Sequence, residues 1–170
     1  NDMDLSCVMK PRAIALVGAS TRDHTIGHDI LQRLLEYGYK GQLFLVNPKG
    51  GVIAGREVFR SVGDLPDAVD LAIIAINARF VLDTVDQCHE RGIQGLVVIS
   101  AGFKETGEAG RALEQALADK VKGFGMTLVG PNCLGVVNTH PDVRMDGCFA
   151  ESLPRRGDIG FVSQSGALGG

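Results

Sequence analysis

The sequence contains no tryptophan, and aromatic residues make up only 5% of its 170 residues. A basic stripe is also missing, because 17 lysines and arginines are outnumbered by 20 aspartates and glutamates, giving a formal net charge of −3. Proteins that bind nucleic acid without sequence preference need clustered cations to replace the counterions of the phosphates. The composition therefore excludes a protein that binds nucleic acid without sequence preference. Any phosphate that the protein binds must be held by charged or hydrogen-bonding groups of individual loops.

Long apolar runs are absent as well. None reaches the roughly 18 consecutive apolar residues of a membrane span, and the first residues lack the basic and apolar regions of a signal peptide. We therefore expect a cytoplasmic protein with no membrane partner. Hydrophobic residues make up 45% of the sequence, and a chain of this length buries roughly two-thirds of its unfolded surface. A core can therefore form without disulfides.

Cysteine and histidine are few and scattered, which argues against a metal site. His24 and His28 lie four residues apart, but Gly27 between them marks the expected start of a helix, so no shared metal-binding face is expected. The cysteines include no Cys-x-x-Cys pair and have no histidine at ligand spacing. They are Cys7, Cys88, Cys133 and Cys148. We expect reduced thiols and no bound metal.

Short apolar runs of strand length recur along the chain, and they are continuous rather than alternating. Such runs indicate strands that are covered on both faces, as in a parallel sheet between layers of helices. They occupy residues 13–17, 43–46, 71–76, 96–99, 127–129 and 159–162.

Helical periodicity lies between these runs. The spacing predicts helices over residues 27–37 and 79–91, each closed by a glycine, Gly38 and Gly92. A third helix is expected behind Thr106 as its N-cap. Its inner stripe would be formed by Ala109, Leu113, Ala116 and Leu117. Alternating strands and helices predict an α/β protein with a Rossmann-like, doubly wound, mostly parallel sheet flanked by helices.

A change in pattern near the end of the sequence suggests a domain boundary. Residues 138–157 have no sustained period and are predicted to form a long connection. Residues 158–163 are then predicted to form a fresh strand that leads into Gln164, Ser165 and Gly166. We expect one domain over residues 1–152, with residues 153–170 as the start of a second, truncated domain.

The loop after the first predicted strand has the features of a phosphate site. Ligands of open parallel sheets lie outside the carboxyl ends of the strands. Here Gly18 permits a tight turn, while Ser20, Thr21 and the loop amides can donate to an anion at the start of the next helix. The loop matches neither G-x-G-x-x-G nor the P-loop pattern. A purely structural turn with capping residues is the alternative interpretation.

The loop after the second predicted strand carries a cation. Proteins that bind the ribose diol of NAD place an acidic residue at this position. This sequence instead has Asn47, Pro48 and Lys49, followed by two glycines. A lysine attracts phosphate, which favours a nucleotide with a ribose phosphate, such as NADP or coenzyme A (CoA). The alternative is a solvated loop lysine.

Three further loops give weaker signals. Ile76 and Asn77, and likewise Ser100 and Ala101, are compatible with a wall for adenine but equally with routine connections. Asn132 carries an amide that can both donate and accept hydrogen bonds. The neighbouring Cys133 is interpreted as a small buried thiol rather than a nucleophile. The carboxylates form no convincing acid–base pair.

Taken together, five segments resemble the N-terminal CoA-binding domain of NDP-forming acyl-CoA synthetases, a group related to the α subunit of succinyl-CoA synthetase. The resemblance extends over about residues 9–168, nearly the whole chain. The five segments are PRAIALVGAS at 11–20, VNPKGG at 46–51, ISAGF at 99–103, GPNCLG at 130–135 and VSQSGAL at 162–168.

The resemblance implies a role in CoA binding for ten residues. The loop of residues 18–21 would hold the pyrophosphate region, Lys49 would face a CoA phosphate, and Asn132 would lie near the pantetheine thiol. Residues 76 and 77 match a Val-Pro pair that flanks the adenosine in the family, although the proline is absent here. The residues are Gly18, Ala19, Ser20, Thr21, Lys49, Ile76, Asn77, Ser100, Ala101 and Asn132.

The resemblance assigns no catalytic residue to this chain. In the family, a histidine of the following domain carries the phosphoryl group, and none of the four histidines here fits its glycine-flanked motif. ATP and Mg would bind only in the missing part, which comprises ligase and ATP-grasp domains, fused or in a separate subunit. The expected function of this chain is therefore to bind CoA and orient its thiol for acyl transfer from an acyl phosphate.

Other functions are compatible with the same pattern. One is the CoA-binding-like domain of a protein lysine acetyltransferase, and another is a stand-alone regulatory domain that binds CoA or NADP. An NADP-dependent dehydrogenase is supported only by Lys49 and opposed by the missing G-x-G-x-x-G motif.

Overall fold

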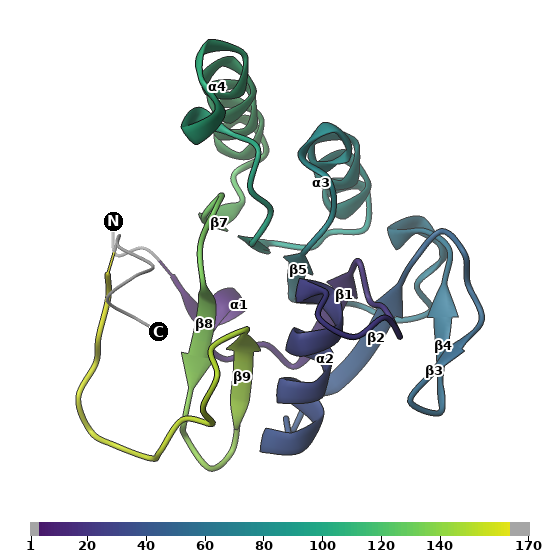
Figure 1. The fold of residues 1–170 in the computed structure, drawn as a ribbon, viewed down its shortest axis with the longest axis vertical. Coiled ribbons are helices and arrows are strands. Elements are labelled where there is room, and N and C mark those ends of the chain that lie inside the picture. Colours follow the sequence, from purple (N-terminus) through teal and green to yellow (C-terminus); the bar gives the residue numbers. More distant parts are fainter. Residues whose placement is uncertain (1–3, 164–170) are drawn as a thin grey trace.

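The computed structural model describes residues 4–163 and shows a sheet between two layers of helices (Figure 1). The order of its seven strands is β3-β4-β2-β1-β5-β6-β7. All neighbouring pairs are parallel except β3–β4. The strands are β1 Ala13–Val17, β2 Gln42–Val46, β3 Val52–Ile53, β4 Arg56–Phe59, β5 Leu71–Ile74, β6 Gly95–Val98 and β7 Thr127–Val129.

The strand order confirms the predicted Rossmann-like fold. From β1 the chain builds outward through β2 and β4, then returns to the other side of β1 and continues through β5, β6 and β7. The direction of winding thus reverses between β1 and β5. Ligands of such sheets bind at the carboxyl ends of the strands near this reversal.

The two faces of the sheet are covered by different elements. α3 (Val81–Glu90) and α4 (Glu108–Phe124) lie on one face. α1 (Ser6–Met9) and α2 (Ile26–Tyr37) lie on the other face (Figure 1). Because both faces are covered, consecutive residues of β1, β5 and β6 are buried, which explains the continuous apolar runs.

The helix α2 confirms the prediction for residues 27–37 and begins one residue earlier. The Thr25 side chain accepts a hydrogen bond from the backbone N–H of His28 at 3.4 Å and caps the first turn. Gly38 ends the helix with a left-handed φ of 79°, and its N–H reaches the carbonyls of Leu34 and Leu35.

The other two helices start differently from the prediction. Residues Ala78–Phe80 form a 3-10 turn before α3. Thr106 is not the N-cap of α4, because its hydroxyl donates to the carbonyl of Phe103 within a second 3-10 turn, Lys104–Thr106. α4 begins after Gly107 instead.

The predicted inner stripe of α4 is only partly right. Leu117 is buried and Leu113 packs against the core, but Ala109 and Ala116 are exposed. The helix buries Gly110 instead, because its backbone packs directly on the carbonyl of Phe103.

The predicted connection over residues 138–157 is wrong in its first half. The chain forms an antiparallel hairpin of β8 (Gly135–Asn138) and β9 (Met145–Cys148), which packs against α2. All four residues of β9 are buried, although one of them is Asp146. Because this polar residue interrupts the apolar run, the sequence pattern does not indicate a strand.

The predicted strand over residues 158–163 is also wrong. The structure assigns no strand there, and the residues Ile159 and Val162 are 93% and 97% exposed. An apolar run becomes a strand only where a neighbour pairs with it, and no strand of residues 4–163 does so. Residues 164–166 lie outside the described part of the chain.

The hairpin buries the carboxyl group of Asp146. Its Oδ1 accepts from the thiol of Cys148 at 2.9 Å, while Oδ2 has no hydrogen-bond partner in the described structure. Burial raises the pKa of the Asp146 carboxyl above its usual range. The native state therefore holds this proton more tightly than the unfolded state, so this group lowers stability as pH rises above about 4.

Asp146→Asn is therefore expected to stabilise the protein at neutral pH. An amide keeps an oxygen acceptor for Cys148 and removes the buried charge, so the gain should be about 1 kcal/mol at pH 7 and smaller at pH 4. Urea unfolding at both pH values measures it. Asp142→Asn is the control, because that side chain is 89% exposed in the turn of the same hairpin. A less stable Asp146→Asn variant at pH 7 would contradict this expectation and show that the site favours the carboxylate over the neutral amide.

Candidate functional site

The predicted site residues all follow strands of the parallel sheet and lie on its carboxyl edge, here called the carboxyl rim. They come after β1 (residues 18–21), β2 (residue 49), β5 (residues 76 and 77), β6 (residues 100 and 101) and β7 (residue 132). Because these strands are parallel, the five loops emerge on the same side of the fold.

Hydrogen bonds between loops tie the rim together. On one side of the reversal, the N–H of Gly18 donates to the carbonyl of Val46 at 2.9 Å. On the other side, the hydroxyl of Ser100 accepts from the N–H of Ile76 at 3.1 Å, and the carbonyl of Ser100 accepts from the N–H of Asn132 at 3.0 Å. The N–H of Ala75 donates to the carbonyl of Val17 at 2.8 Å and joins these two groups, so the rim is connected rather than made of five independent loops.

Two positions, one in the loop after β1 and one at the start of α2, have room only for glycine. Gly18 has a φ of +99°, and a Cβ on it would overlap the carbonyl oxygen of Ala75. A Cβ on Gly27, in the first turn of α2, would overlap the carbonyl oxygen of Gly18. The loop thus lies in direct backbone contact with the start of the helix. Ala19 is fully buried, so neither its side chain nor its backbone is exposed on the rim.

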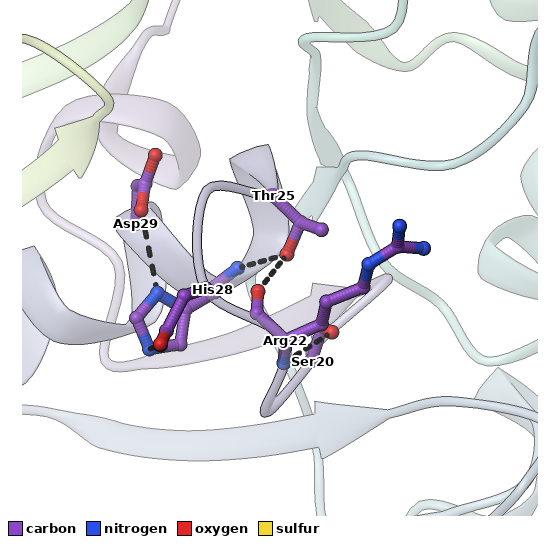
Figure 2. A network of polar contacts seen from close by, with 6 residues as sticks. Ser20, Arg22, Thr25, His28 and Asp29 are labelled. Atoms are coloured by element: carbon purple, nitrogen blue, oxygen red, sulfur yellow. Dashed lines mark hydrogen bonds and ion pairs between the residues drawn. The ribbon is translucent and has the colours of Figure 1, made fainter.

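Polar contacts within residues 20–29 hold the rest of this loop (Figure 2). The Ser20 hydroxyl accepts from the N–H of Arg22 at 3.0 Å, and the Thr25 hydroxyl donates to the Arg22 carbonyl at 2.8 Å. The ring of His28 contacts the carboxylate of Asp29 at 3.3 Å. The Ser20 hydroxyl proton stays available to an anion, and the neighbouring Thr21 side chain is exposed.

Asn47 organises the loop after β2. Its Nδ2 donates to the carbonyl of Ala19 and its Oδ1 accepts from the N–H of Lys49, both at 2.9 Å. Its backbone N–H donates to the carbonyl of Phe59, and its carbonyl accepts from the N–H of Gly50, again at 2.9 Å. Asn47 therefore connects three strand ends. Lys49 is exposed, and no carboxylate of residues 4–163 lies within 4 Å of its ammonium group.

The loops after β5 and β6 use their polar side chains internally. Asn77 caps the following 3-10 turn by accepting from the N–H of Arg79 at 3.1 Å. Ser100 is 5% exposed, and its hydroxyl links Ile74 and Ile76 at the end of β5. Ile76 is half-buried and Ala101 is exposed, so these two side chains supply an apolar surface on the rim.

The loop after β7 presents an amide and conceals a thiol. Asn132 is exposed and has a left-handed φ of 53°. Cys133 is half-buried, and its thiol donates to the carbonyl of Val98 at 3.4 Å. Burial raises the pKa of the Cys133 thiol, which disfavours the thiolate that a nucleophile requires. The geometry supports the interpretation of Cys133 as a structural residue.

Cations surround the rim, and sequence reasoning identified only one of them. They follow the ends of five strands: Arg22 after β1, Lys49 after β2, Arg60 after β4, Arg79 after β5 and Lys104 after β6. Lys104 pairs with Glu114 at 3.5 Å, and the guanidinium of Arg79 lies 4.5 Å from the ring centroid of Phe80.

The signal that locates these cations is their position in the loops that follow the strands. Arg60 escaped detection because the short strand β4 was not predicted.

Within residues 4–163, no three side chains of histidine, cysteine, aspartate and glutamate gather as metal ligands. No helix in that range is long and apolar enough to cross a membrane.

Comparison with known proteins identifies the family that shares these features. Residues 12–139 match the family model of a CoA binding domain. The alpha subunit of acetate–CoA ligase (ADP-forming) I from Pyrococcus furiosus is 39% identical over 171 residues, which cover 98% of this chain and 37% of that protein.

Solved structures show the same similarity. A protein from Pyrococcus horikoshii has a TM-score of 0.91 at 42% identity, covering 98% of this chain and 37% of its own. The dinucleotide-forming acetyl-coenzyme A synthetase 1 of Candidatus Korarchaeum cryptofilum, in complex with phosphate and ADP, has a TM-score of 0.90 at 39% identity over 98% and 35% of the two chains. This chain therefore spans little more than a third of these relatives. Since the family model matches most of its residues, the chain belongs to the CoA-binding domain family.

Proposed function

We propose that this chain is the CoA-binding module of an NDP-forming, specifically ADP-forming, acyl-CoA synthetase. The carboxyl rim carries the proposal, because its loops on one edge of the sheet combine a glycine-only turn with cations, and among the five cations of residues 4–163 named above only Lys104 has a carboxylate partner. The naming of a relative as the alpha subunit of an ADP-forming acetate–CoA ligase supports this choice of enzyme.

The donors on the rim fit the chemical groups of CoA. The loop of residues 18–21 suits the pyrophosphate through the Ser20 hydroxyl, the exposed Thr21 and the amino end of α2, because the N–H of Gly18 is already bonded to the Val46 carbonyl. Lys49 suits the ribose phosphate. Ile76, together with Asn77, Ser100 and Ala101, would border the adenosine, and Asn132 would lie near the pantetheine thiol.

In this proposal the chain contributes binding and orientation. The contacts hold the nucleotide end of the coenzyme, which is distant from the reacting sulfur. They position the thiol without using binding contacts at the reacting centre itself. The Cys133 thiol donates a hydrogen bond to the Val98 carbonyl, and its burial disfavours the thiolate that a nucleophile requires. We propose that it binds CoA but does not complete ligation alone.

The remaining chemistry is assigned to other domains. We propose that residues 1–152 form the Rossmann-like CoA-binding domain and that residues 153–170 begin a second, flavodoxin-like ligase domain. ATP and Mg would bind in an ATP-grasp domain, fused or in a separate subunit, and a histidine outside this chain would carry the phosphoryl group. The four cysteines are free in the structure, which supports a reducing, cytoplasmic location.

Calorimetric titration with CoA, dephospho-CoA and NADP tests the proposal. CoA should bind best, and loss of its 3′-phosphate should weaken binding by about 1–2 kcal/mol because a charge-assisted contact is lost. Lys49→Gln should remove most of this difference. Lys40→Gln is the matched control, since Lys40 is also exposed but precedes β2 on the opposite edge of the sheet.

Two results would contradict the proposal. Equal affinity of the unaltered protein for CoA and dephospho-CoA would remove Lys49 from its role. A preference for NADP would overturn the assignment to CoA.

A further inference from the structure

Arg60 lies beside Lys49 on the carboxyl rim. It follows Phe59, the last residue of β4, and β4 is the parallel neighbour of β2. Phe59 is the register partner of Val46, the last residue of β2. The two strands therefore end at the same level, and each is followed within three residues by a cation.

The Lys49 turn is bonded along β4. The N–H of Asn47 donates to the Phe59 carbonyl, and the N–H of Val58 donates to the Gly51 carbonyl, both at 2.9 Å. Between these bonds, a Cβ placed on Gly50 would lie 3.3 Å from both Cγ and Nε of Arg60. The Arg60 side chain thus runs along the backbone of the turn that carries Lys49.

Neighbouring carboxylates do not neutralise Arg60. Asp64, the nearest acidic residue that follows it, is engaged by Ser61, whose N–H and hydroxyl donate to Oδ2 at 3.1 and 2.8 Å. No carboxylate of residues 4–163 lies within 4 Å of the Arg60 or Lys49 nitrogen atoms. The bonds of Phe59 and Ser61 also hold the backbone on both sides of Arg60.

We infer that Arg60 and Lys49 together bind the phosphate monoester of the nucleotide, an inference that rests on the proposed CoA-binding function. A phosphate monoester carries a charge of about −1.5 to −2 at pH 7, more than one lysine neutralises. A planar guanidinium adds two parallel hydrogen bonds to phosphate oxygens, which the ammonium group cannot supply. The pair therefore selects a nucleotide that carries a ribose phosphate monoester, which dephospho-CoA lacks.

Titration of Arg60→Gln with CoA and dephospho-CoA tests the inference. The variant should bind CoA about tenfold more weakly, the loss expected for a charge-assisted bidentate contact. Its affinity for dephospho-CoA should change less than twofold. Arg60→Lys should give an intermediate loss for CoA, because it keeps the charge and loses the planar group.

Arg56→Gln provides a matched control. Arg56 is the first residue of β4 and is exposed on the opposite edge of the sheet. This variant makes the same change in net charge and should leave the affinity for both ligands within twofold of the unaltered protein. Thermal unfolding of all variants checks that the fold is retained.

The outcomes separate this inference from the proposed function. If the unaltered protein distinguishes CoA from dephospho-CoA and Lys49→Gln abolishes the difference, but Arg60→Gln behaves like Arg56→Gln, only the role of Arg60 is overturned. Equal weakening of both ligands by Arg60→Gln would place Arg60 at the pyrophosphate and also overturn the inference. Failure of the unaltered protein to bind CoA would overturn the proposed function itself.

Discussion

Phe103→Ala is expected to lower the free energy of unfolding by about 3–5 kcal/mol, as for other fully buried aromatic side chains. Phe103 is 0% exposed and packs in the core that α3 and α4 form against the sheet. Its carbonyl also accepts from the N–H and the hydroxyl of Thr106 at 2.9 and 2.8 Å. Truncation would leave a cavity directly under the loop after β6.

Urea unfolding measures this loss, with Phe161→Ala as the control. Phe161 is 71% exposed, so removal of its side chain should change stability by less than about 0.5 kcal/mol. CoA affinity, measured well below the unfolding transition, should change little in Phe103→Ala. The hydrogen bonds of Ser100 to Ile76 and Asn132 still hold the loop in place. A loss of stability below 1 kcal/mol would show that Phe103 is not a core residue.

Gly27→Ala is expected to destabilise the protein by about 2–3 kcal/mol and to weaken CoA binding at the same time. An added Cβ would overlap the carbonyl oxygen of Gly18 and lie 3.6 Å from the N–H nitrogen of Ala19. Either the loop after β1 or the first turn of α2 must move. Both are proposed to face the pyrophosphate, so stability and affinity should fall together.

Gly123→Ala is the matched control for Gly27→Ala. Gly123 is also a helical glycine, near the end of α4, but a Cβ placed there would meet no heavy atom within 4 Å. Alanine should stabilise the protein at this position by about 0.5 kcal/mol. Urea unfolding and CoA titration of both variants provide the measurement. Unchanged affinity in a destabilised Gly27→Ala variant would remove the loop after β1 from the CoA site.

Much of the fold was predictable because both faces of the central sheet are covered. The residues of β1, β5 and β6 are buried without alternation, so each strand is visible as a short apolar run. Helix ends were predictable where a single residue determines them, as with Gly38 at the end of α2. The candidate loops were then located simply by following each predicted strand to its end.

Elements whose neighbours decide their conformation could not be predicted. β4 buries only Val58 and lies near the edge of the sheet, so its sequence has no apolar run, and Arg60 was missed with it. β9 buries Asp146, which conceals the strand. The apolar residues 159–162 have the composition of a strand but pair with no strand of residues 4–163.

The sequence by itself determined the fold class and the positions of the loops on the carboxyl rim, because local apolar runs and glycines encode strands and turns directly. Only the tertiary structure decided how these loops are joined, for example through the bonds from Asn47 to Ala19 and Lys49. It also placed Arg60 beside the Lys49 turn. Such contacts depend on strand order and register, which bring together residues that are distant in the sequence, and no local pattern records them.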